Sequence, residues 1–350
     1  MSGIAACNSA GALSVLTQGD VEHFLEHGWI KLSNCFSQEQ VDELTSNLWT
    51  RLGMSPTDKG TWHSDSCVEG RMNLPNHNEF LADEFAPKAW NAICDLLGGE
   101  ERVSDERRTW NDGFIINFGT PEAEGKDIRP QDLPGWHVDG DFFIHYLDSP
   151  EQGLLVIPLF TDINPGGGGT QICPGAIPRI AKHLYDHPEG VTPYMLPRSE
   201  EPSMERGKLA FFCDIAKSLP GEDFVEATGK VGDVYLLHPL MLHSASNNKL
   251  RQLRIITNPP VSLKEPFAFD RQNESDYSVV ERKTIAAIGK DGLQGWKITG
   301  GRDRVIPERL RKQQKMREEE LKRLEELKAK LPASLQPTEM APSQRATIAT

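Results

Sequence analysis

The sequence lacks the marks of several protein classes. Its six cysteines, at positions 7, 35, 67, 94, 173 and 213, form no CxxC pair. Neither a zinc ribbon nor a disulfide framework is expected, and reduced thiols in an intracellular protein are favoured. No basic segment precedes Lys31, the first Lys or Arg, so we expect no secretory signal peptide. No apolar run is long enough to cross a bilayer. These absences predict a cytoplasmic protein without a membrane partner.

Positive charge is also in short supply. The 350 residues include 38 Lys and Arg against 51 Asp and Glu, which gives a formal net charge of −13. Broad binding to nucleic acid needs a basic surface, so nucleic acid is not expected as a partner. A small-molecule substrate remains, including an anionic one held by one or two local cations.

Helical signals dominate the part of the chain from 17 to 109, which follows a flexible leader at 1–16. Thr17 is placed to cap a first helix that ends at Gly28, and residues 29–36 are typical of a strand. Ser37 and Gln40 form a capping box for a second helix. A third helix is expected over 84–97, before a Gly-Gly pair.

Short apolar runs separated by Gly- and Pro-rich turns begin at about residue 110. They predict strands of an antiparallel sandwich or barrel, at 113–118, 153–160, 170–173, 209–213, 234–243 and 253–261. We therefore predict one domain over 17–305, with a β core at 110–262 and a C-terminal extension at 263–305. A charged helix is expected at 306–331, lying against the domain in solvent, and a disordered tail at 332–350.

The stretch "WHVD" carries the first chemical signal. On an extended backbone His137 and Asp139 point to the same face, where an imidazole and a carboxylate can occupy adjacent positions of a metal ion. A second histidine on that face would complete a set that suits Fe(II) and leaves positions open for oxygen chemistry.

The third ligand is expected in "GDVYLLHPLMLHSAS". This stretch holds His238 and His243, and strand alternation favours His243. Arg254 begins a later apolar run, where its guanidinium can grip a carboxylate of 2-oxoglutarate with two hydrogen bonds. Arg251 is the alternative for that contact.

Several stretches together resemble the phytanoyl-CoA dioxygenase-like family. They are "WHVD", "GGGTQICPGAI", "GDVYLLHPLMLHSAS" and "LRQLRIITNPPV", together with the N-terminal helix–strand–helix pattern, and they cover roughly residues 17–262. The resemblance implies an Fe(II)/2-oxoglutarate-dependent oxygenase. The implied fold is mainly β with N-terminal helices (α+β), built on a double-stranded β-helix core of the jelly-roll or cupin-like type.

Carried over to this chain, the resemblance implies that His137, Asp139 and His243 are the catalytic iron ligands. Arg254 and the Thr170 hydroxyl would bind the cosubstrate. The chain departs from the family where Ala245 stands for a frequent serine and where "PGSH" is "PGAI". Because related halogenases carry Ala or Gly in place of Asp139, oxygen insertion is expected and halogenation is not.

For several other polar residues a structural role is an alternative to a role in the site. Asn117 is a candidate for contact with cosubstrate or substrate, or else an ordinary polar residue of a strand. The triplet at 63–65 repeats the His-x-Asp pattern but is expected in a loop. His183 and His187 have zinc-binding spacing, yet no third ligand is evident, so a surface helix is favoured. His145 is expected to be a wall residue.

The predicted function is a dioxygenase that uses Fe(II), O2 and 2-oxoglutarate to oxidise, typically by hydroxylation, a small organic metabolite. Succinate and CO2 are the expected coproducts. The alternatives are a cupin-like metal protein that binds or isomerises a ligand without O2, and a scaffold that uses the charged helix. The sequence leaves the substrate open, and it is compatible with a homodimer.

Overall fold

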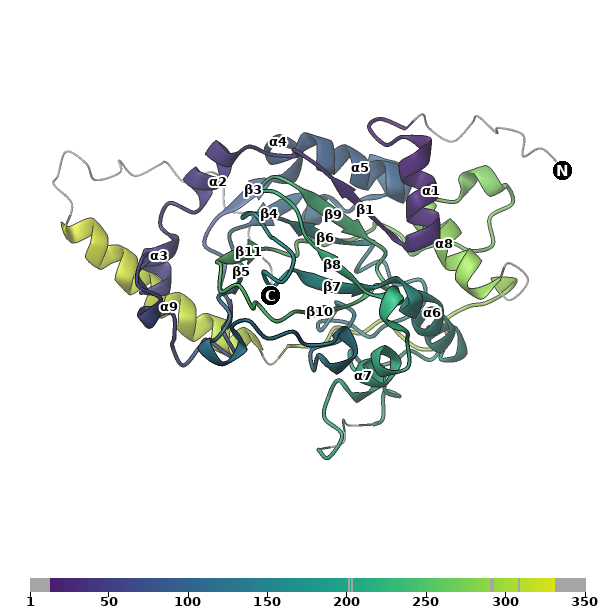
Figure 1. Cartoon of the computed structure of the whole chain (residues 1–350). Coiled ribbons are helices and arrows are strands. Elements are labelled where there is room, and N and C mark those ends of the chain that lie inside the picture. Colours follow the sequence, from purple (N-terminus) through teal and green to yellow (C-terminus); the bar gives the residue numbers. More distant parts are fainter. Residues whose placement is uncertain (1–12, 201, 203, 290–292, 308, 331–350) are drawn as a thin grey trace.

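The computed structural model describes residues 13–330 apart from 201, 203, 290–292 and 308 (Figure 1). Antiparallel sheets occupy its centre and helices lie around them. The helices are α1 (Gln18–His27), α2 (Gln38–Leu44), α3 (Leu48–Leu52), α4 (Ala82–Phe85), α5 (Pro87–Leu97), α6 (Ile177–Asp186), α7 (Ala210–Lys217), α8 (Val279–Ile288) and α9 (Arg309–Lys330). In these described residues, no helix combines the length and apolar character that crossing a membrane requires.

Every strand pair between the named strands is antiparallel, as the turn-rich sequence predicts. The sheets have the orders β1-β9-β6-β12, β10-β7-β8, β11-β5-β2 and β3-β4. The strands are β1 (Trp29–Leu32), β2 (Arg71–Asn73), β3 (Glu79–Leu81), β4 (Thr109–Asn111), β5 (Ile115–Asn117), β6 (Leu154–Pro158), β7 (Thr170–Cys173), β8 (Val225–Ala227), β9 (Val234–Leu237), β10 (Leu242–Ala245), β11 (Arg254–Ile256) and β12 (Pro260–Val261).

The central strand β6 is buried on both faces. Successive side chains of a strand point in opposite directions. Leu154 and Val156 accordingly join the larger hydrophobic cluster, while Leu155 and Ile157 join a second one. A strand between two apolar layers needs apolar residues at every position, which explains the unbroken run in the sequence.

The predicted caps of the first two helices are confirmed, whereas the predicted strand at 29–36 is shorter and covers Trp29–Leu32. Thr17 caps α1 in a capping box with Asp20, and Gly28 ends the helix with a left-handed φ of 73°. Ser37 and Gln40 form the second capping box, at α2. The third helix is interrupted, since Pro87 starts α5 directly after the short α4.

Four local predictions are wrong. The run 253–261 makes two strands, β11 and β12, with residues 257–259 between them. The run 209–213 belongs to helix α7, whose buried Phe212 and Ala216 stand four residues apart, as on one face of a helix. The run 234–243 makes two strands, because the chain turns between β9 and β10 at His238–Met241. The leader does not extend to residue 16, since Leu16 is buried and Ser14 hydrogen-bonds to Asp95.

Helices are therefore not confined to the N-terminal part, and α8 had no counterpart among the predicted elements. The charged helix is present as α9, which lies beside α3 at one side of the molecule (Figure 1). It is less solvated than predicted, because Glu320 on its inner face is only 1% exposed. Residues 1–12 of the predicted leader and the predicted tail at 332–350 lie outside the described residues.

Candidate metal centre

Two backbone hydrogen bonds set His137 beside His243. The amide of each residue donates to the carbonyl of the other, at 3.0 and 2.9 Å, in an isolated antiparallel bridge. Their ring centroids are 4.3 Å apart. His243 lies in β10, whereas His137 lies in a loop, so the bridge joins two stretches that are distant in the sequence.

Asp139 completes a compact set of donor atoms. One ligand atom from each of His137, Asp139 and His243 can be chosen so that all three lie within 4.8 Å of one another. Asp139 Oδ1 stands 3.4 Å from the Nε2 atom of each histidine. Gly140 follows with a φ of 117°, and a Cβ there would meet the rings of Phe143 and His145 at 2.6 to 2.7 Å. A residue without a side chain is required for the chain to turn away from the site.

The tautomer of both histidines follows from their backbone partners. Nδ1 of His137 is 2.7 Å from the carbonyl of Gly135, and Nδ1 of His243 is 3.0 Å from that of Met241. A carbonyl oxygen only accepts, so each Nδ1 carries a hydrogen. In the neutral rings the Nε2 lone pairs then face Asp139, which is the orientation of metal-binding histidines.

The three groups bias one another electrostatically. Burial alone raises the pKa of Asp139, but the charges and hydrogen bonds of the two histidines outweigh burial and hold the pKa well below its usual value. Burial alone lowers the pKa of His137, yet the hydrogen bond and the charge of Asp139 raise the pKa above its usual value. The carboxylate is therefore ionised, and it attracts positive charge to the space between the rings.

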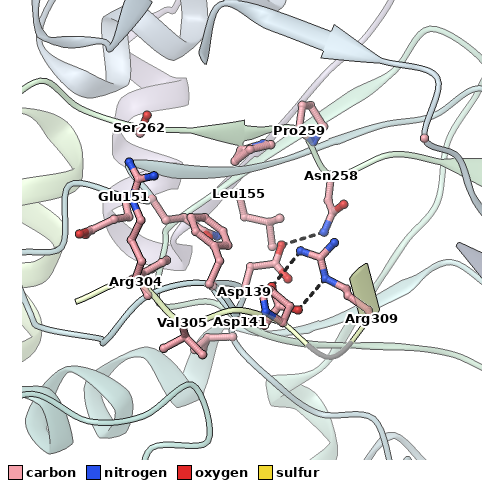
Figure 2. A pocket seen from close by; sticks show the side chains of 18 of the residues that line it. Asp139, Asp141, Glu151, Leu155, Asn258, Pro259, Ser262, Arg304, Val305 and Arg309 are labelled. Carbon is pink, nitrogen blue, oxygen red and sulfur yellow. Dashed lines mark hydrogen bonds and ion pairs between the residues drawn. The ribbon is translucent and has the colours of Figure 1, made fainter. Parts of the chain in front are cut away.

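Asn258 orients the carboxylate of Asp139. Its Nδ2 donates to Asp139 Oδ2 at 3.0 Å (Figure 2). The other oxygen, Oδ1, is the one that faces the two histidines. A hydrogen bond to one carboxylate oxygen restrains the direction of the other, as is common around metal ligands.

The three residues lie at the edge of a cavity of about 1080 Å³ that His137 and Asp139 help to line. Ligand pockets commonly have volumes of roughly 300 to 1000 Å³, so the space is ample for a small organic molecule. Figure 2 shows the cavity, with an ion pair between Asp141 and Arg309 next to Asp139. Because it opens beside the donor set, a substrate can reach a metal held there.

Arg254 is a buried cation without a carboxylate partner among the described residues. It begins β11, is 1% exposed, and donates from Nε to the carbonyl of Gly168 and from Nη1 to that of Ile115, at 2.8 and 3.1 Å. Burial lowers its pKa to about 9, with the nearby Arg71 as a second cause. A buried guanidinium of this kind is stabilised by an anionic ligand.

The other two predicted cosubstrate residues have different surroundings. Thr170 is buried on β7, where it pairs with Ala245 and Ala227. Asn117 lies opposite Arg254 on β5. Its Nδ2 donates to the carbonyl of Ser246 and its Oδ1 accepts from the amide of Gly119, both at 3.0 Å. The Asn117 side chain therefore holds backbone segments together.

The alternative histidines are engaged elsewhere. His238 is buried and its Nε2 is 3.0 Å from the Thr284 hydroxyl of α8. The His183 ring contacts the backbone carbonyl of Met195, and the His187 ring contacts the backbone carbonyl of His183. Among the residues that the structure describes, no other group of three His, Cys, Asp or Glu side chains has metal-binding geometry.

The remaining alternatives also find other environments. Arg251 lies in a turn with a φ of 47° and stands 3.7 Å from Glu124 on another loop. The 63–65 triplet lies in a loop, as predicted, and its His63 and Asp65 side chains are exposed. His145 is buried, stacks on Phe143 and lies 2.7 Å from the carbonyl of Gly140.

Sequence reasoning missed Asn258 and the Asp141–Arg309 pair. Asn258 stands at an even spacing from Arg254, and strand alternation would have placed both residues on one face. Arg309 approaches Asp141 from 168 residues further along the chain. No local pattern reveals a contact between such distant residues.

Several solved structures are similar to this chain. HygX from Streptomyces hygroscopicus, solved with nickel, 2-oxoglutarate and hygromycin B bound, is 12% identical with a TM-score of 0.38, covering 71% of this chain and 88% of that chain. The α-ketoglutarate-dependent carbocyclase SnoK from nogalamycin biosynthesis is 16% identical with a TM-score of 0.36, covering 71% and 84%. EctD from S. alaskensis is 17% identical with a TM-score of 0.37, covering 76% and 84%.

A search of curated proteins finds no match. The profile of the phytanoyl-CoA dioxygenase (PhyH) family matches residues 24–256. This match includes all three clustered donor residues and Arg254. The chain belongs to the phytanoyl-CoA dioxygenase family of Fe(II)/2-oxoglutarate-dependent oxygenases.

Proposed function

We propose that His137, Asp139 and His243 bind Fe(II), and that the enzyme uses 2-oxoglutarate and O2 to hydroxylate a small organic metabolite. The proposal rests on one observation above all. Donor atoms of two imidazoles and one carboxylate, from distant stretches of the chain, lie within 4.8 Å of one another beside a large cavity.

The donor set fits Fe(II). Two neutral imidazoles and one carboxylate on a single face are the ligands of non-haem Fe(II) oxygenases, and they leave coordination positions for other molecules. Nδ1 of each histidine donates to a backbone carbonyl, which leaves its Nε2 lone pair for the metal. When bound, the ion supplies the activation of O2, with 2-oxoglutarate as the second reductant that leaves as succinate and CO2.

Arg254 is proposed to bind the distal carboxylate of 2-oxoglutarate. Its burial and its lack of a described carboxylate partner both favour an anion at this place. We propose the Thr170 hydroxyl as a second contact of the cosubstrate. We assign Asn117 an indirect part, because its amide already holds Ser246 and Gly119.

Asp139 bears on the type of reaction. A carboxylate at this position fills the place that an Ala or Gly leaves to a halide in related halogenases. We therefore propose oxygen insertion as the outcome. His145, whose pKa burial lowers to about 4, stays neutral beside the site and adds no competing positive charge.

The proposed organisation follows the antiparallel core. Residues 110–262 are assigned to a double-stranded β-helix, residues 17–109 to a helical N-terminal part and residues 263–305 to an extension of the same domain. We also propose that the enzyme acts in the cytoplasm, which agrees with the free thiols of the cysteines that the structure describes.

Anaerobic addition of Fe(II) and 2-oxoglutarate tests the site directly. The proposal expects a visible absorption band from the chelated complex, and its loss in His137→Ala. The control is His63→Ala in the exposed loop, which should keep the band. No band in the unaltered protein, or an undiminished band in His137→Ala, contradicts the assignment. Succinate release that requires O2 separates the oxygenase from a cupin-like isomerase.

A further inference from the structure

One wall of the cavity comes from outside the part of the chain that matches the family. Residues 302–307, called here the C-terminal wall, lie beside the segment that follows the His-Val-Asp motif. The amide of Ile144 donates to the carbonyl of Asp303 at 3.0 Å, and the amide of Val305 donates to that of Phe142 at 2.8 Å. The C-terminal wall is therefore joined by backbone hydrogen bonds to the segment that directly follows His137 and Asp139.

Ion pairs of α9 fix the wall at its far end. Arg309 forms two hydrogen bonds with the carboxylate of Asp141, at 2.6 and 2.9 Å. Further along α9, Glu320 is 2.8 Å from Arg51, and both side chains are fully or almost fully buried. A buried charge pair is costly to break, so the wall is a fixed part of the cavity.

Most charged side chains of the wall already have partners. Arg302 is 2.8 Å from Asp148, and Asp303 pairs with Arg198. Arg304 is the exception. Its side chain is exposed, lines the cavity, and has no hydrogen bond or ion pair with the described residues. A fixed wall thus presents one unpaired guanidinium to the cavity.

Glu151 lines the same cavity, and its carboxylate has an oxygen atom without a hydrogen-bond donor among the described residues. Its Oε2 atom is buried and accepts no hydrogen bond from the described residues. Burial raises the pKa of this carboxyl group, although the positive charges of Arg302 and Arg304 act in the opposite direction. Figure 2 shows Glu151 and Arg304 at one end of the cavity, away from Asp139 and Arg309, and no ion pair joins them.

We propose that Arg304 and Glu151 bind the head group of an amino acid-type substrate, with its carboxylate on Arg304 and its ammonium on Glu151. This inference rests on the proposed function, because the remainder of the substrate then extends toward His137, Asp139 and His243. One zwitterionic group satisfies both side chains at once. A purely acidic head group leaves Glu151 unpaired, and a purely basic one leaves Arg304 unpaired.

Binding is tested on the full chain loaded with Ni(II) and 2-oxoglutarate, in which turnover does not complicate the measurement. Isothermal titration calorimetry compares three kinds of ligand for each of three side chains. They are the amino acids L-leucine, L-phenylalanine and L-lysine, their methyl esters, and the corresponding acids without the amino group. The amino acids should bind, and each of the other two sets should bind at least about tenfold more weakly.

Variants assign the contacts. Arg304→Gln and Glu151→Gln should each weaken amino acid binding by about tenfold or more. Arg311→Gln is the matched control, since Arg311 is exposed on α9 and does not line the cavity; it should bind as the unaltered protein does. The Arg304 side chain is exposed, so its replacement leaves the fold intact.

Three results overturn the inference: esters or deaminated acids that bind as well as the amino acids, an unchanged dissociation constant in Arg304→Gln, or no binding by any amino acid of the set. The anaerobic Fe(II)/2-oxoglutarate band keeps this failure apart from failure of the proposed function. A band without amino acid binding rejects the head-group assignment alone, whereas no band rejects the metal and cosubstrate assignment.

Discussion

Replacing Arg254 by methionine should abolish 2-oxoglutarate binding without destabilising the protein. The two effects have the same cause. In the fold, the guanidinium is 1% exposed and has no carboxylate partner among the described residues, so it carries a burial cost that an anionic ligand would relieve. A residue kept only for packing would show the opposite pattern.

The size of the stability effect follows from the Arg254 environment. Burial, with a contribution from Arg71, lowers its pKa from 12.5 to about 9. At about 1.4 kcal/mol per pKa unit, keeping the charge at neutral pH costs on the order of 5 kcal/mol. Methionine removes this cost but also removes the hydrogen bonds of Arg254 to the carbonyls of Gly168 and Ile115, at about 1 to 3 kcal/mol each. The free energy of unfolding should therefore stay near its original value or rise by up to about 3 kcal/mol.

Urea unfolding followed by the fluorescence of the seven tryptophans measures both effects. With Ni(II) present, 2-oxoglutarate at a hundredfold excess over its dissociation constant should stabilise the unaltered protein by about 2.7 kcal/mol and leave Arg254→Met unchanged. Arg51→Met is the matched control. Arg51 is equally buried but lies near Asp112 and Glu320, so its loss should cost about 3 to 5 kcal/mol. A comparable loss in Arg254→Met would refute the reasoning.

Three further outcomes follow from other contacts. Asn258→Ala should weaken Fe(II) binding by roughly 10- to 100-fold, measured by metal titration, because Asp139 loses the donor that orients it. Glu320→Gln should lower the free energy of unfolding by about 3 kcal/mol in urea, since Arg51 loses one of its two carboxylates. Burial lowers the pKa of His238 from 6.5 to about 3, so between these pH values the folded protein holds fewer protons than the unfolded chain. The free energy of unfolding should therefore fall as the pH drops from 6.5 to 3, and it should fall less steeply in His238→Gln.

Each of these has its own control or contrary result. Metal affinity unchanged in Asn258→Ala would mean that Asp139 is oriented without the amide. Glu319→Gln, at an exposed position of the same helix, should leave urea unfolding unchanged. Acid unfolding of His238→Gln that matches the unaltered protein would assign the pH dependence to other groups.

Local chemistry explains which parts of the structure could be predicted. Caps and stops such as Thr17, Ser37 and Gly28 act within a few residues, and each is confirmed. The run at 209–213 was misread because a short apolar stretch fits a buried strand and a buried helix equally well. The turn at His238–Met241 was missed because only His238 and Pro239 interrupt the apolar run at 234–242.

The site divides in the same way. His137 and Asp139 share a face because of their spacing. Strand alternation favoured His243, a later apolar run supplied Arg254, and the family resemblance agreed with both. The convergence of His137, Asp139 and His243 within 4.8 Å depends on a backbone bridge between distant stretches. The contact of Arg309 with Asp141 spans 168 residues and involves two surface-type residues that occur in any soluble helix or loop. Such pairings are decided by the completed fold.

The placement of the C-terminal wall has a consequence for the order in which the enzyme is made. The ribosome adds Arg309 168 residues after Asp141, when the loop that holds His137 and the strand β10 that holds His243 have already been synthesised. A nascent chain can therefore assemble its metal-binding face before the cavity has its last side. Chains that end before α9 would lack the contact of Arg309 with Asp141, so the side of the cavity next to Asp139 would stay open.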